Sequence, residues 1–299
     1  MFDVVIIGAG PAGLTAAIYG ARNNLKVGIV EQGAPGGAIV NTPEVQNYPG
    51  FKSINGADLA YSMFDQAMAL GVSYFGFAVK SVRKEADMFF VEGDETLEAK
   101  AVIVATGTIH KNLGVKGEDE FSGKGISWCA ICDGTFFKGR DVAVIGGGNS
   151  AFEESIYLSS LVKTVYLIHH REGFRADAIL IDKVKAIPNI KMVLNQKVLE
   201  FIGHEALEKL RLLNVKTNEE SFLEVPGCFE FVGSAPSTSF LKDLGVVGAN
   251  GYIPVDKHGE TPVKGLFAGG DVIEKEVRQI ATAINDGAIA ALSVIKSLK

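Results

Sequence analysis

Short apolar runs alternate with Ala-rich stretches of helical period along the first part of the chain. The pattern predicts a strand over residues 3–7, a helix over 14–23 and a second strand over 26–30. A helix over 56–70 and a set of β-like segments reaching Val104 follow. Strand–helix–strand order of this kind is typical of a parallel α/β sheet.

The same plan begins again about 138 residues further on. We expect a strand over 141–145, a helix over 150–160 and a strand over 164–168. The chain then ends in an apolar segment over 266–271 and a long helix over 280–297. Two copies of one unit in 299 residues predict an α/β protein with two Rossmann-like nucleotide-binding domains.

Composition narrows the class of protein. Hydrophobic residues make up 47% of the chain and charged residues 21%, which is ordinary for a globular protein and unlike a disordered one. A net charge of −6 argues against a general nucleic-acid binder. Three cysteines are too few for a secreted disulfide scaffold.

The first apolar run is not preceded by the basic residues of a secretory signal, so we expect none. Residues 4–21 are uncharged and could suggest a membrane span. Glycine and proline interrupt this run between positions 8 and 13, however, and a strand, turn and helix explain it better. We therefore expect a cytoplasmic protein that binds neither membrane nor nucleic acid.

A glycine-rich turn links the first predicted strand to the first helix. It reads Gly8-Ala9-Gly10-Pro11-Ala12-Gly13, the pattern GxGxxG. The first glycine permits the tight turn, the second lets backbone approach a pyrophosphate, and the third lets the helix pack close to the strand. Glu31 ends the next strand, where a carboxylate can accept hydrogen bonds from ribose hydroxyls. The turn therefore predicts a dinucleotide site.

Two segments outside this unit favour FAD as that dinucleotide. Residues 266–271, Leu-Phe-Ala-Gly-Gly-Asp, resemble the segment by which two-domain flavoprotein reductases hold the ribityl–phosphate link of the flavin through an aspartate, here Asp271. Residues 102–107, Val-Ile-Val-Ala-Thr-Gly, resemble a second strand-end signature of the same superfamily. With the first turn, they indicate bound FAD held by segments from both ends of the chain.

The second glycine turn is followed by a different kind of loop. Residues 146–151 read GxGxxA, again between a predicted strand and helix. The next strand runs into His169-His170-Arg171-Glu172-Gly173-Phe174-Arg175, where the first copy has Glu31. This strand end offers no carboxylate to a 2′-hydroxyl, and the planar guanidinium of arginine suits a 2′-phosphate. The loop predicts NADPH as the second nucleotide, against the alternative of a solvated basic loop.

A cysteine pair lies between the two nucleotide turns. Two residues separate Cys129 from Cys132, a spacing that lets their sulfurs form a reversible disulfide. Asp133 follows directly and is placed to exchange a proton with a leaving thiolate. A zinc site would need two further ligands, so we expect no metal, and a thioredoxin-like fold would not carry two dinucleotide turns. The third cysteine, Cys228, lies in a β-rich stretch and is predicted to be buried and inert.

These landmarks stand in the order found in low-molecular-weight thioredoxin reductases of the bacterial and archaeal kind, which the chain resembles over essentially its whole length. The matching segments are residues 8–13, 36–50, 105–107, 129–134, 146–151, 169–176 and 269–279. The resemblance implies an FAD-binding domain from residues 1–112 and 239–299, with an NADPH-binding domain over 113–238 inserted into it. It also implies one bound FAD per chain, NADPH as co-substrate, a homodimer, and a thioredoxin or thioredoxin-like partner.

The resemblance also implies roles for individual residues. Cys129, Cys132 and Asp133 would be catalytic, with the Cys132 sulfur nearer the flavin ring. The implied FAD-binding residues are Gly8, Gly10, Pro11, Ala12, Gly13, Glu31, Gly37, Ala38, Asn47, Thr106, Gly107, Gly270, Asp271, Arg278 and Gln279. The implied NADPH-binding residues are Gly148, Asn149, Ser150, Glu153, His169, His170, Arg171 and Arg175, with Glu153 approaching the nicotinamide.

Two positions depart from the family pattern. Ala38 follows Gly36-Gly37 where the family usually has glutamine, so one hydrogen bond to the flavin is expected to be missing. His170 replaces the first arginine of the usual His-Arg-Arg loop, which would weaken the preference for NADP or make it depend on pH through the imidazole.

The implied activity is thioredoxin-disulfide reduction, with electrons passing from NADPH through FAD to the Cys129/Cys132 disulfide and then to thioredoxin. The alternative is a related flavin disulfide reductase with another acceptor protein or another donor, ferredoxin or NADH. A ferredoxin-dependent enzyme would be expected to lack the second glycine turn, and a flavin-binding sensor would need neither the cysteines nor the NADP loop. The nicotinamide and the cysteines must both reach one flavin, and the dithiol must also reach the protein partner. We therefore expect the inserted domain to rotate about linkers near Gly114 and Pro236.

Overall fold

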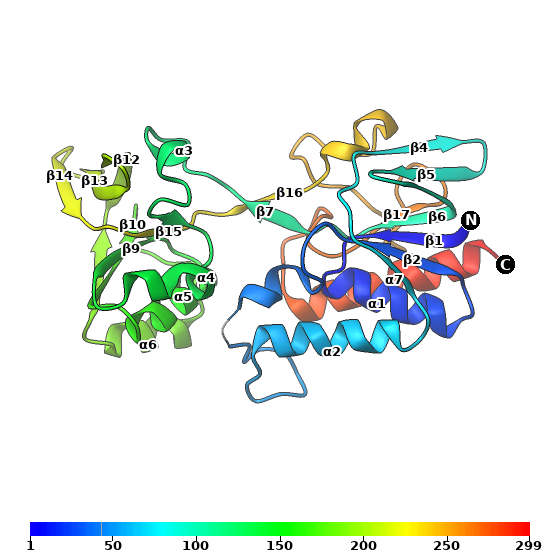
Figure 1. Ribbon diagram of the computed structural model, residues 1–299, viewed down its shortest axis with the longest axis horizontal. Coiled ribbons are helices and arrows are strands. Elements are labelled where there is room, and N and C mark those ends of the chain that lie inside the picture. Colours follow the sequence, from blue (N-terminus) through cyan, green and yellow to red (C-terminus); the bar gives the residue numbers. More distant parts are fainter. Residues whose placement is uncertain (43) are drawn as a thin grey trace. The chain divides into compact units, whose positions relative to one another are not determined.

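Two compact units make up the computed structural model, which describes residues 1–42 and 44–299 (Figure 1). Unit 1 contains residues 1–109 and 235–299, and unit 2 contains residues 110–234. The sequence of unit 2 is therefore inserted into that of unit 1, and the chain passes from one unit to the other twice.

The two passages are short strands, β7 (Thr108–His110) and β16 (Ser234–Pro236), which pair with each other. The predicted linker position at Gly114 lies beyond the first passage, inside unit 2. The reason is that the buried Glu118 carboxylate accepts hydrogen bonds from the backbone N–H groups of residues 113–115, at 2.8, 2.6 and 3.3 Å. These bonds hold the segment after β7 to unit 2.

In the described part of unit 1, seven strands form one sheet in the order β3-β2-β1-β6-β5-β4, with β17 pairing to β6. Their bounds are β1 Phe2–Ile7, β2 Val27–Val30, β3 Ser73–Phe75, β4 Ser81–Glu85, β5 Met88–Glu92, β6 Thr96–Val104 and β17 Leu266–Ala268. Strands β1, β2, β3, β6 and β17 run parallel, whereas β4 and β5 form an antiparallel extension. β1 and β2 are buried almost throughout, which explains their unbroken apolar sequences.

Helices α1 (Pro11–Arg22), α2 (Gly56–Met68) and α7 (Ile280–Ser297) cover one face of this sheet (Figure 1). α1 begins three residues before its predicted start because Pro11, whose φ is fixed, occupies the first helical position. α7 has the predicted bounds. Two 3₁₀ turns complete unit 1, at Gly37–Asn41 and Ser239–Leu244.

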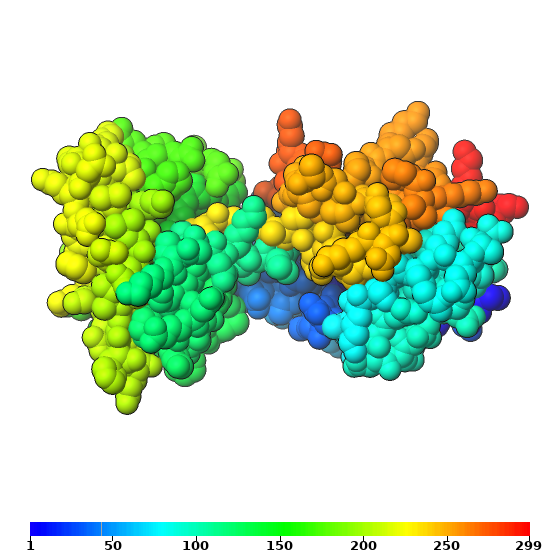
Figure 2. Space-filling model, turned by 90° about the horizontal axis from the view of Figure 1, so that it is seen from above, coloured from blue at the N-terminus to red at the C-terminus, as the bar shows by residue number. Residues whose placement is uncertain are grey.

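The two sequence segments of unit 1 are packed tightly together. A Cβ added at Gly287 of α7 would lie 2.1 Å from the Ala12 carbonyl oxygen of α1, so only glycine allows this approach of the helices. Figure 2 shows the same joining at the surface of unit 1, where atoms coloured blue and cyan lie beside atoms coloured orange and red. Residues from both ends of the chain therefore share one fold.

Unit 2, which is described throughout, has a five-stranded parallel sheet in the order β11-β10-β9-β15-β8. The strand bounds are β8 Ile126–Ser127, β9 Asp141–Gly146, β10 Thr164–His169, β11 Ile190–Leu194 and β15 Cys228–Phe231. The helices are α3 Glu118–Phe121, α4 Ala130–Asp133, α5 Asn149–Ser159 and α6 Ala178–Ala186, with a 3₁₀ turn at Gly134–Phe137. A separate antiparallel sheet contains β12 Gln196–Gly203, β13 Leu207–Asn214 and β14 Glu220–Glu224.

The arrangement β1–α1–β2 recurs as β9–α5–β10, which confirms the prediction of two Rossmann-like units. In each unit the glycine turn follows the carboxyl end of a strand that has neighbours on both sides, the position where nucleotides bind in such sheets. None of the helices found in residues 1–42 and 44–299 combines the length and the apolar character needed to span a bilayer.

Candidate cofactor and redox sites

The first glycine turn of unit 1 has a geometry that other residues could not adopt. Gly8 has φ +105°, and a Cβ there would lie 2.4 Å from the Ala105 carbonyl oxygen. A Cβ at Gly13 would lie 1.9 Å from the carbonyl oxygen of Gly8. Gly10 precedes α1, and no side chain among the described residues caps this helix. The amide end of α1 is therefore available to an anion such as a pyrophosphate.

Further glycines meet at the start of α1. Gly37 has φ +61°, and a Cβ there would lie 3.1 Å from the Gly10 Cα atom. A Cβ at Gly270 would lie 2.8 Å from the Ala12 Cβ atom, whereas Gly107 faces open space. Four segments far apart in the sequence thus bring bare backbone to one place. A cradle of this kind, free of side chains, suits close approach of a dinucleotide.

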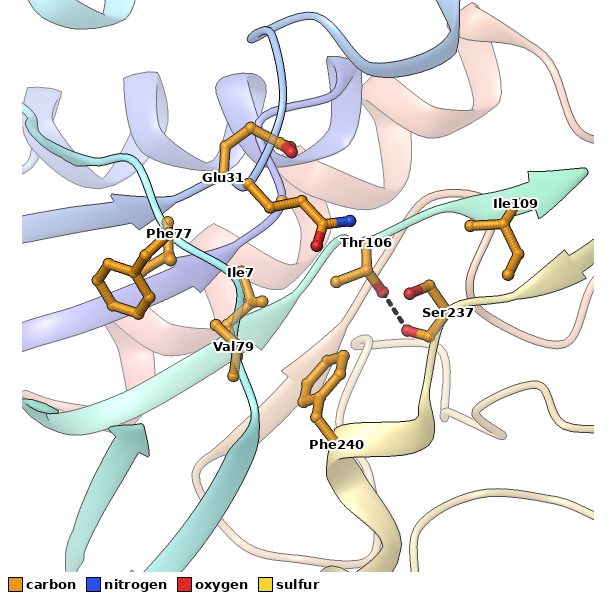
Figure 3. Close-up of a pocket in the computed structure, with 11 residues that line it drawn as sticks. Ile7, Glu31, Phe77, Val79, Thr106, Ile109, Ser237 and Phe240 are labelled. Atoms are coloured by element: carbon orange, nitrogen blue, oxygen red, sulfur yellow. Dashed lines mark hydrogen bonds between the residues drawn. The ribbon is translucent and has the colours of Figure 1, made fainter. Parts of the chain in front are cut away.

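Glu31 lies at the end of β2 beside an open pocket (Figure 3). Its two carboxylate oxygens accept hydrogen bonds from the backbone N–H groups of Ala9 and Gly33, at 2.9 and 2.8 Å, and these bonds fix the carboxylate in place. Each oxygen keeps a second lone pair for a ribose hydroxyl. The pocket walls include Phe77 and Phe240. One fixed carboxylate among apolar walls suits the adenosine end of a dinucleotide.

Thr106 is placed on the same pocket by contacts within unit 1. Its hydroxyl donates a hydrogen bond of 2.7 Å to the Ser237 carbonyl oxygen, shown dashed in Figure 3. Thr106 follows β6, whereas Ser237 follows the second passage of the chain. The bond therefore joins the two sequence segments of unit 1 at the pocket edge.

Asp271 has a buried carboxylate oxygen, Oδ1, with no hydrogen-bond partner among the described residues. Burial raises its pKa, although Lys275 opposes the shift from 3.5 Å away. The Lys275 ammonium also pairs with Asp286 at 2.7 Å. The Lys275 ammonium forms an ion pair with this same oxygen at 3.5 Å but no hydrogen bond, and the hydroxyls of a ribityl chain would provide a closer donor. Together with the glycine cradle and Glu31, this orphaned acceptor shows that the residues present fit FAD.

The remaining predicted FAD residues lie around the Asp271 loop and the first turn of α7. Arg278 donates to the carbonyl oxygens of Asp271 and Ile273, at 3.3 and 3.4 Å, so it supports the loop through its backbone. Asn47 donates a hydrogen bond of 3.1 Å to Gln279, which brings the two predicted residues together. Ala38 is exposed in the 3₁₀ turn after Gly37.

Sequence reasoning missed the Lys275–Asp286 pair. Lys275 stands alone between Glu274 and Glu276 in an acidic segment just after Asp271, and this lone cation was the available signal. Its partner Asp286 lies on α7, so their contact depends on how the helix folds back.

In unit 2 the second glycine turn packs against the ring of His169. A Cβ at Gly147 would lie 2.3 Å from the His169 ring, and the Gly147 carbonyl oxygen accepts a hydrogen bond of 2.7 Å from the Arg175 backbone. His169 is buried and stacks on Phe174 with ring centres 5.5 Å apart. Burial, the largest cause, lowers its pKa. The His169 ring therefore lies beneath the turn, and its part in nucleotide binding stays a prediction.

The other predicted basic side chains lie exposed on the same loop. The Arg171 Nε–H donates to His170 Nε2 at 3.0 Å, an arrangement that requires a neutral imidazole. Burial, followed by the charges of Arg171 and Arg175, lowers the pKa of His170. The Arg171 and Arg175 side chains are therefore permanently cationic, whereas His170 becomes cationic only at acidic pH.

Asn149, at the start of α5, holds this loop in place. Its side chain donates to the Asp177 carboxylate at 3.0 Å and accepts from the Asp177 backbone N–H at 2.8 Å. Gly148 precedes α5 with open space around it, and no side chain of unit 2 caps the helix. Ser150 is exposed beside it, and Glu153 is half-buried one turn further on. Burial and then Asp177 raise the pKa of Glu153.

Cys129 and Cys132 form a disulfide in unit 2, with their Cα atoms 5.3 Å apart. The Cys129 backbone N–H donates to the Ser127 hydroxyl at 3.0 Å, and the Asp133 N–H donates to the Cys129 carbonyl oxygen at 3.2 Å. Cys132 is exposed, whereas Cys129 and Asp133 are half-buried. Cys228 is buried as a free thiol, which confirms its predicted burial, and its inertness stays a prediction.

Three buried acids of unit 2 were also missed. Glu118 and Glu230 are 3% and 0% exposed, and burial, together with Glu118, raises the pKa of Glu230 to about 9. The third, Glu154 on α5, is 8% exposed. An acid within the apolar strand Cys228–Phe231 was the signal for Glu230, because every position of a buried parallel strand tends to be apolar.

Comparison with known proteins agrees with this geometry. The chain matches a family model described as pyridine nucleotide-disulphide oxidoreductase over residues 2–287. It is 47% identical to a thioredoxin reductase of Ureaplasma parvum over 294 residues, which is 98% of this chain and 95% of the relative. Crystal structures of the thioredoxin reductases of Lactococcus lactis and T. acidophilum match it with TM-scores of 0.97 and 0.96, at 38% and 42% identity, covering 99% of this chain and 98% of each. The chain therefore belongs to the pyridine nucleotide-disulphide oxidoreductase family, among its low-molecular-weight thioredoxin reductases.

Proposed function

We propose that the protein reduces the disulfide of a thioredoxin with electrons from NADPH, through bound FAD and the Cys129/Cys132 disulfide. The observation that carries the proposal is the disulfide itself, which lies in the same unit as a dinucleotide turn with a basic loop. The other unit holds the glycine cradle and the orphaned Asp271 oxygen that fit FAD. One chain thus carries every group that the relay needs.

When bound, FAD supplies a carrier that takes two electrons from a nicotinamide and passes them to a disulfide. The work of the chain is to hold and protonate the sulfurs. Breaking the Cys129–Cys132 bond with two electrons and two protons yields two thiols. Asp133 is half-buried beside the second cysteine and would exchange one of these protons. The dithiol would then be oxidised again by the disulfide of the acceptor.

The acceptor would dock beside Asp133, where an open cavity of about 410 Å³ lies within unit 2. Lys124 and Arg140 line it with Phe136, whose surface is 74% exposed. A cavity lined by an exposed aromatic ring and two cations suits a protein partner with an apolar, acidic rim. We further propose a homodimer, as the family resemblance implies, and a cytoplasmic location. We also propose a rotation of unit 2 about β7 and β16, because the nicotinamide and the cysteines must both reach one flavin and the cysteines must also reach the partner.

The direct test mixes purified protein with NADPH and thioredoxins of its own host. We expect bleaching of the flavin absorbance on adding NADPH alone, and stoichiometric thiol formation in thioredoxin when it is present. NADH or reduced ferredoxin in place of NADPH tests the other donors. Efficient turnover with either, but not with NADPH, would contradict the proposed donor.

Removing both loop arginines should weaken NADPH binding selectively. We expect the double variant Arg171→Ala/Arg175→Ala to raise KM for NADPH by about 100-fold or more, because two charged hydrogen bonds to phosphate are lost and each contributes about 1.5–3 kcal/mol. KM for NADH, which lacks the 2′-phosphate, should change little and is the control. An equal rise of KM for both nucleotides would show that the loop does not recognise the 2′-phosphate.

Removing the Asp271 carboxylate should weaken FAD retention. We expect Asp271→Ala to raise the Kd for FAD by about 10- to 100-fold, since a charge-assisted hydrogen bond to the cofactor is lost. Flavin released on dilution, followed by its fluorescence, measures this without reference to turnover. Asp243→Ala, at an exposed position of the same unit, is the control. Unchanged retention in Asp271→Ala would exclude the proposed contact.

A further inference from the structure

A buried acid lies against the redox turn of unit 2. Glu154, on α5, is 8% exposed, and its Oε2 atom is buried without a hydrogen-bond partner among the described residues. The backbone N–H of Ala130 lies close enough to the Glu154 carboxyl group to oppose the rise of its pKa. Ala130 begins α4 and directly follows Cys129. The carboxyl group therefore lies at the Cys129 end of the disulfide turn.

The packing of α4 on α5 explains this placement. Leu158 lies one helical turn after Glu154 and on the same face of α5. A Cβ at Gly134, which directly follows α4, would lie 3.0 Å from the Leu158 Cδ2 atom. Ala130 and Leu158 also belong to one buried apolar cluster. Both ends of α4 thus contact one face of α5, with Glu154 at the end that carries Cys129.

The groups around Glu154 add acidic charge and apolar surface. Burial raises the pKa of Glu154 to about 8, and Glu153 on the same helix adds to the shift. Asp177, which precedes α6, raises the pKa of Glu153. Cys132 and Asp133 lie on α4, and Cys129 directly precedes it. The neighbouring apolar cluster contains one side chain from each of five further elements. They are Val184 of α6, Val144 of β9, Leu167 of β10, Ile190 of β11 and Phe229 of β15.

Cys129 is the sulfur on which a negative charge would be stabilised. The Cys132 backbone N–H lies 3.2 Å from the Cys129 sulfur and donates to it. Two electrons from the proposed NADPH–FAD route and one proton would convert the disulfide to a Cys132 thiol and a Cys129 thiolate. An ionised carboxylate at the neighbouring amide would oppose that thiolate, whereas a neutral carboxyl group would not.

We propose that Glu154 is a positioning residue of the redox site, which holds the Ala130 end of the turn and links its own proton to thiolate formation at Cys129. At neutral pH Glu154 is protonated and permits the thiolate. As the pH rises through about 8, its carboxylate and the Cys129 thiolate disfavour each other. The inference rests on the proposed redox role of the disulfide.

The test uses the FAD-loaded full chain in a Cys132→Ser background, where Cys129 is a free thiol. The rate of alkylation by iodoacetamide from pH 6 to 10 reports its thiolate, because Cys228 is fully buried and burial raises its pKa. We expect Glu154→Gln, which keeps size and acceptor, to shift the profile to lower pH by up to about one unit, with the largest difference above pH 8. Glu205→Gln, at an exposed turn, should leave the profile unchanged.

Two outcomes would overturn the inference. Coincident profiles at every pH would remove the link between the two groups. A uniform change that is already present at pH 6 would assign Glu154 a structural role only. Neither readout uses NADPH or thioredoxin, so a failure here is distinct from a failure of the proposed electron route, which turnover of the Cys132→Ser protein tests separately.

Discussion

Cys129→Ser and Cys132→Ser are each expected to reduce turnover with thioredoxin to below about one-thousandth of the original rate. Two-electron exchange with an acceptor disulfide requires both sulfurs, because the first forms a mixed disulfide and the second resolves it. Bleaching of the flavin by NADPH should persist in both variants, since neither nucleotide site contains these residues. Rapid mixing with NADPH and a coupled thioredoxin assay separate the two steps.

Cys228→Ala is the matched control for this experiment. Cys228 is 0% exposed in an apolar cluster with Leu210 and Val225. We expect it to take no part in the disulfide exchange. Its replacement should leave turnover intact and cost about 1 kcal/mol of stability through lost packing. Thiol formation in thioredoxin by a Cys129→Ser/Cys132→Ser double variant would end the proposed relay.

The second large effect concerns the stability of unit 2 and its dependence on pH. Burial holds the pKa of Glu230 at about 9, whereas its ordinary value is 4.5. Because the folded pKa is raised, the folded state binds one more proton between these values, so the contribution of Glu230 to stability is fully present below pH 4.5 and is lost as pH rises towards 9. The loss approaches about 1.4 kcal/mol per pH unit, or about 4 kcal/mol from pH 5 to 8.

We expect Glu230→Gln to remove this slope, because the amide has the size of the protonated acid but does not titrate. Trp128 is the single tryptophan of the chain and lies in unit 2, so its fluorescence during urea unfolding follows this unit. Glu224→Gln, at an exposed position of β14, removes the same charge and should retain the slope. An unchanged pH dependence in Glu230→Gln would show that Glu230 is ionised in the folded protein.

The elements with strong local signals were predictable from the sequence. The long helix over 280–297 has the observed bounds because its Ala-rich period is unbroken and Gln279 and Thr282 cap it. The two glycine turns were found because tight turns and close approaches require glycine wherever they occur. The start of α1 was misplaced by three residues because Pro11 was assigned to the turn rather than to the first helical position.

Contacts between distant positions could not be predicted in this way. Glu118 and Glu230 meet only after the sheet of unit 2 has formed, and nothing near either residue in the sequence indicates the other. The same holds for Lys275 with Asp286 and for Glu154 with Ala130. Glu230 lies in a buried strand and the other residues lie in ordinary helix or loop sequence, so the sequence near each one does not show which partner it meets.

The insertion of unit 2 also shapes how the protein is made. Strand β17 pairs with β6, and α7 contacts α1, so the sheet of unit 1 is completed by residues after 235. On a translating ribosome, at about 5–20 residues per second, the edge of β6 waits about 8–30 seconds for its partner while unit 2 emerges. An exposed strand edge invites aggregation during that interval. Nascent chains that stop before β17 would lack both this cover and the Asp271 loop, and would be substrates for chaperones and proteases.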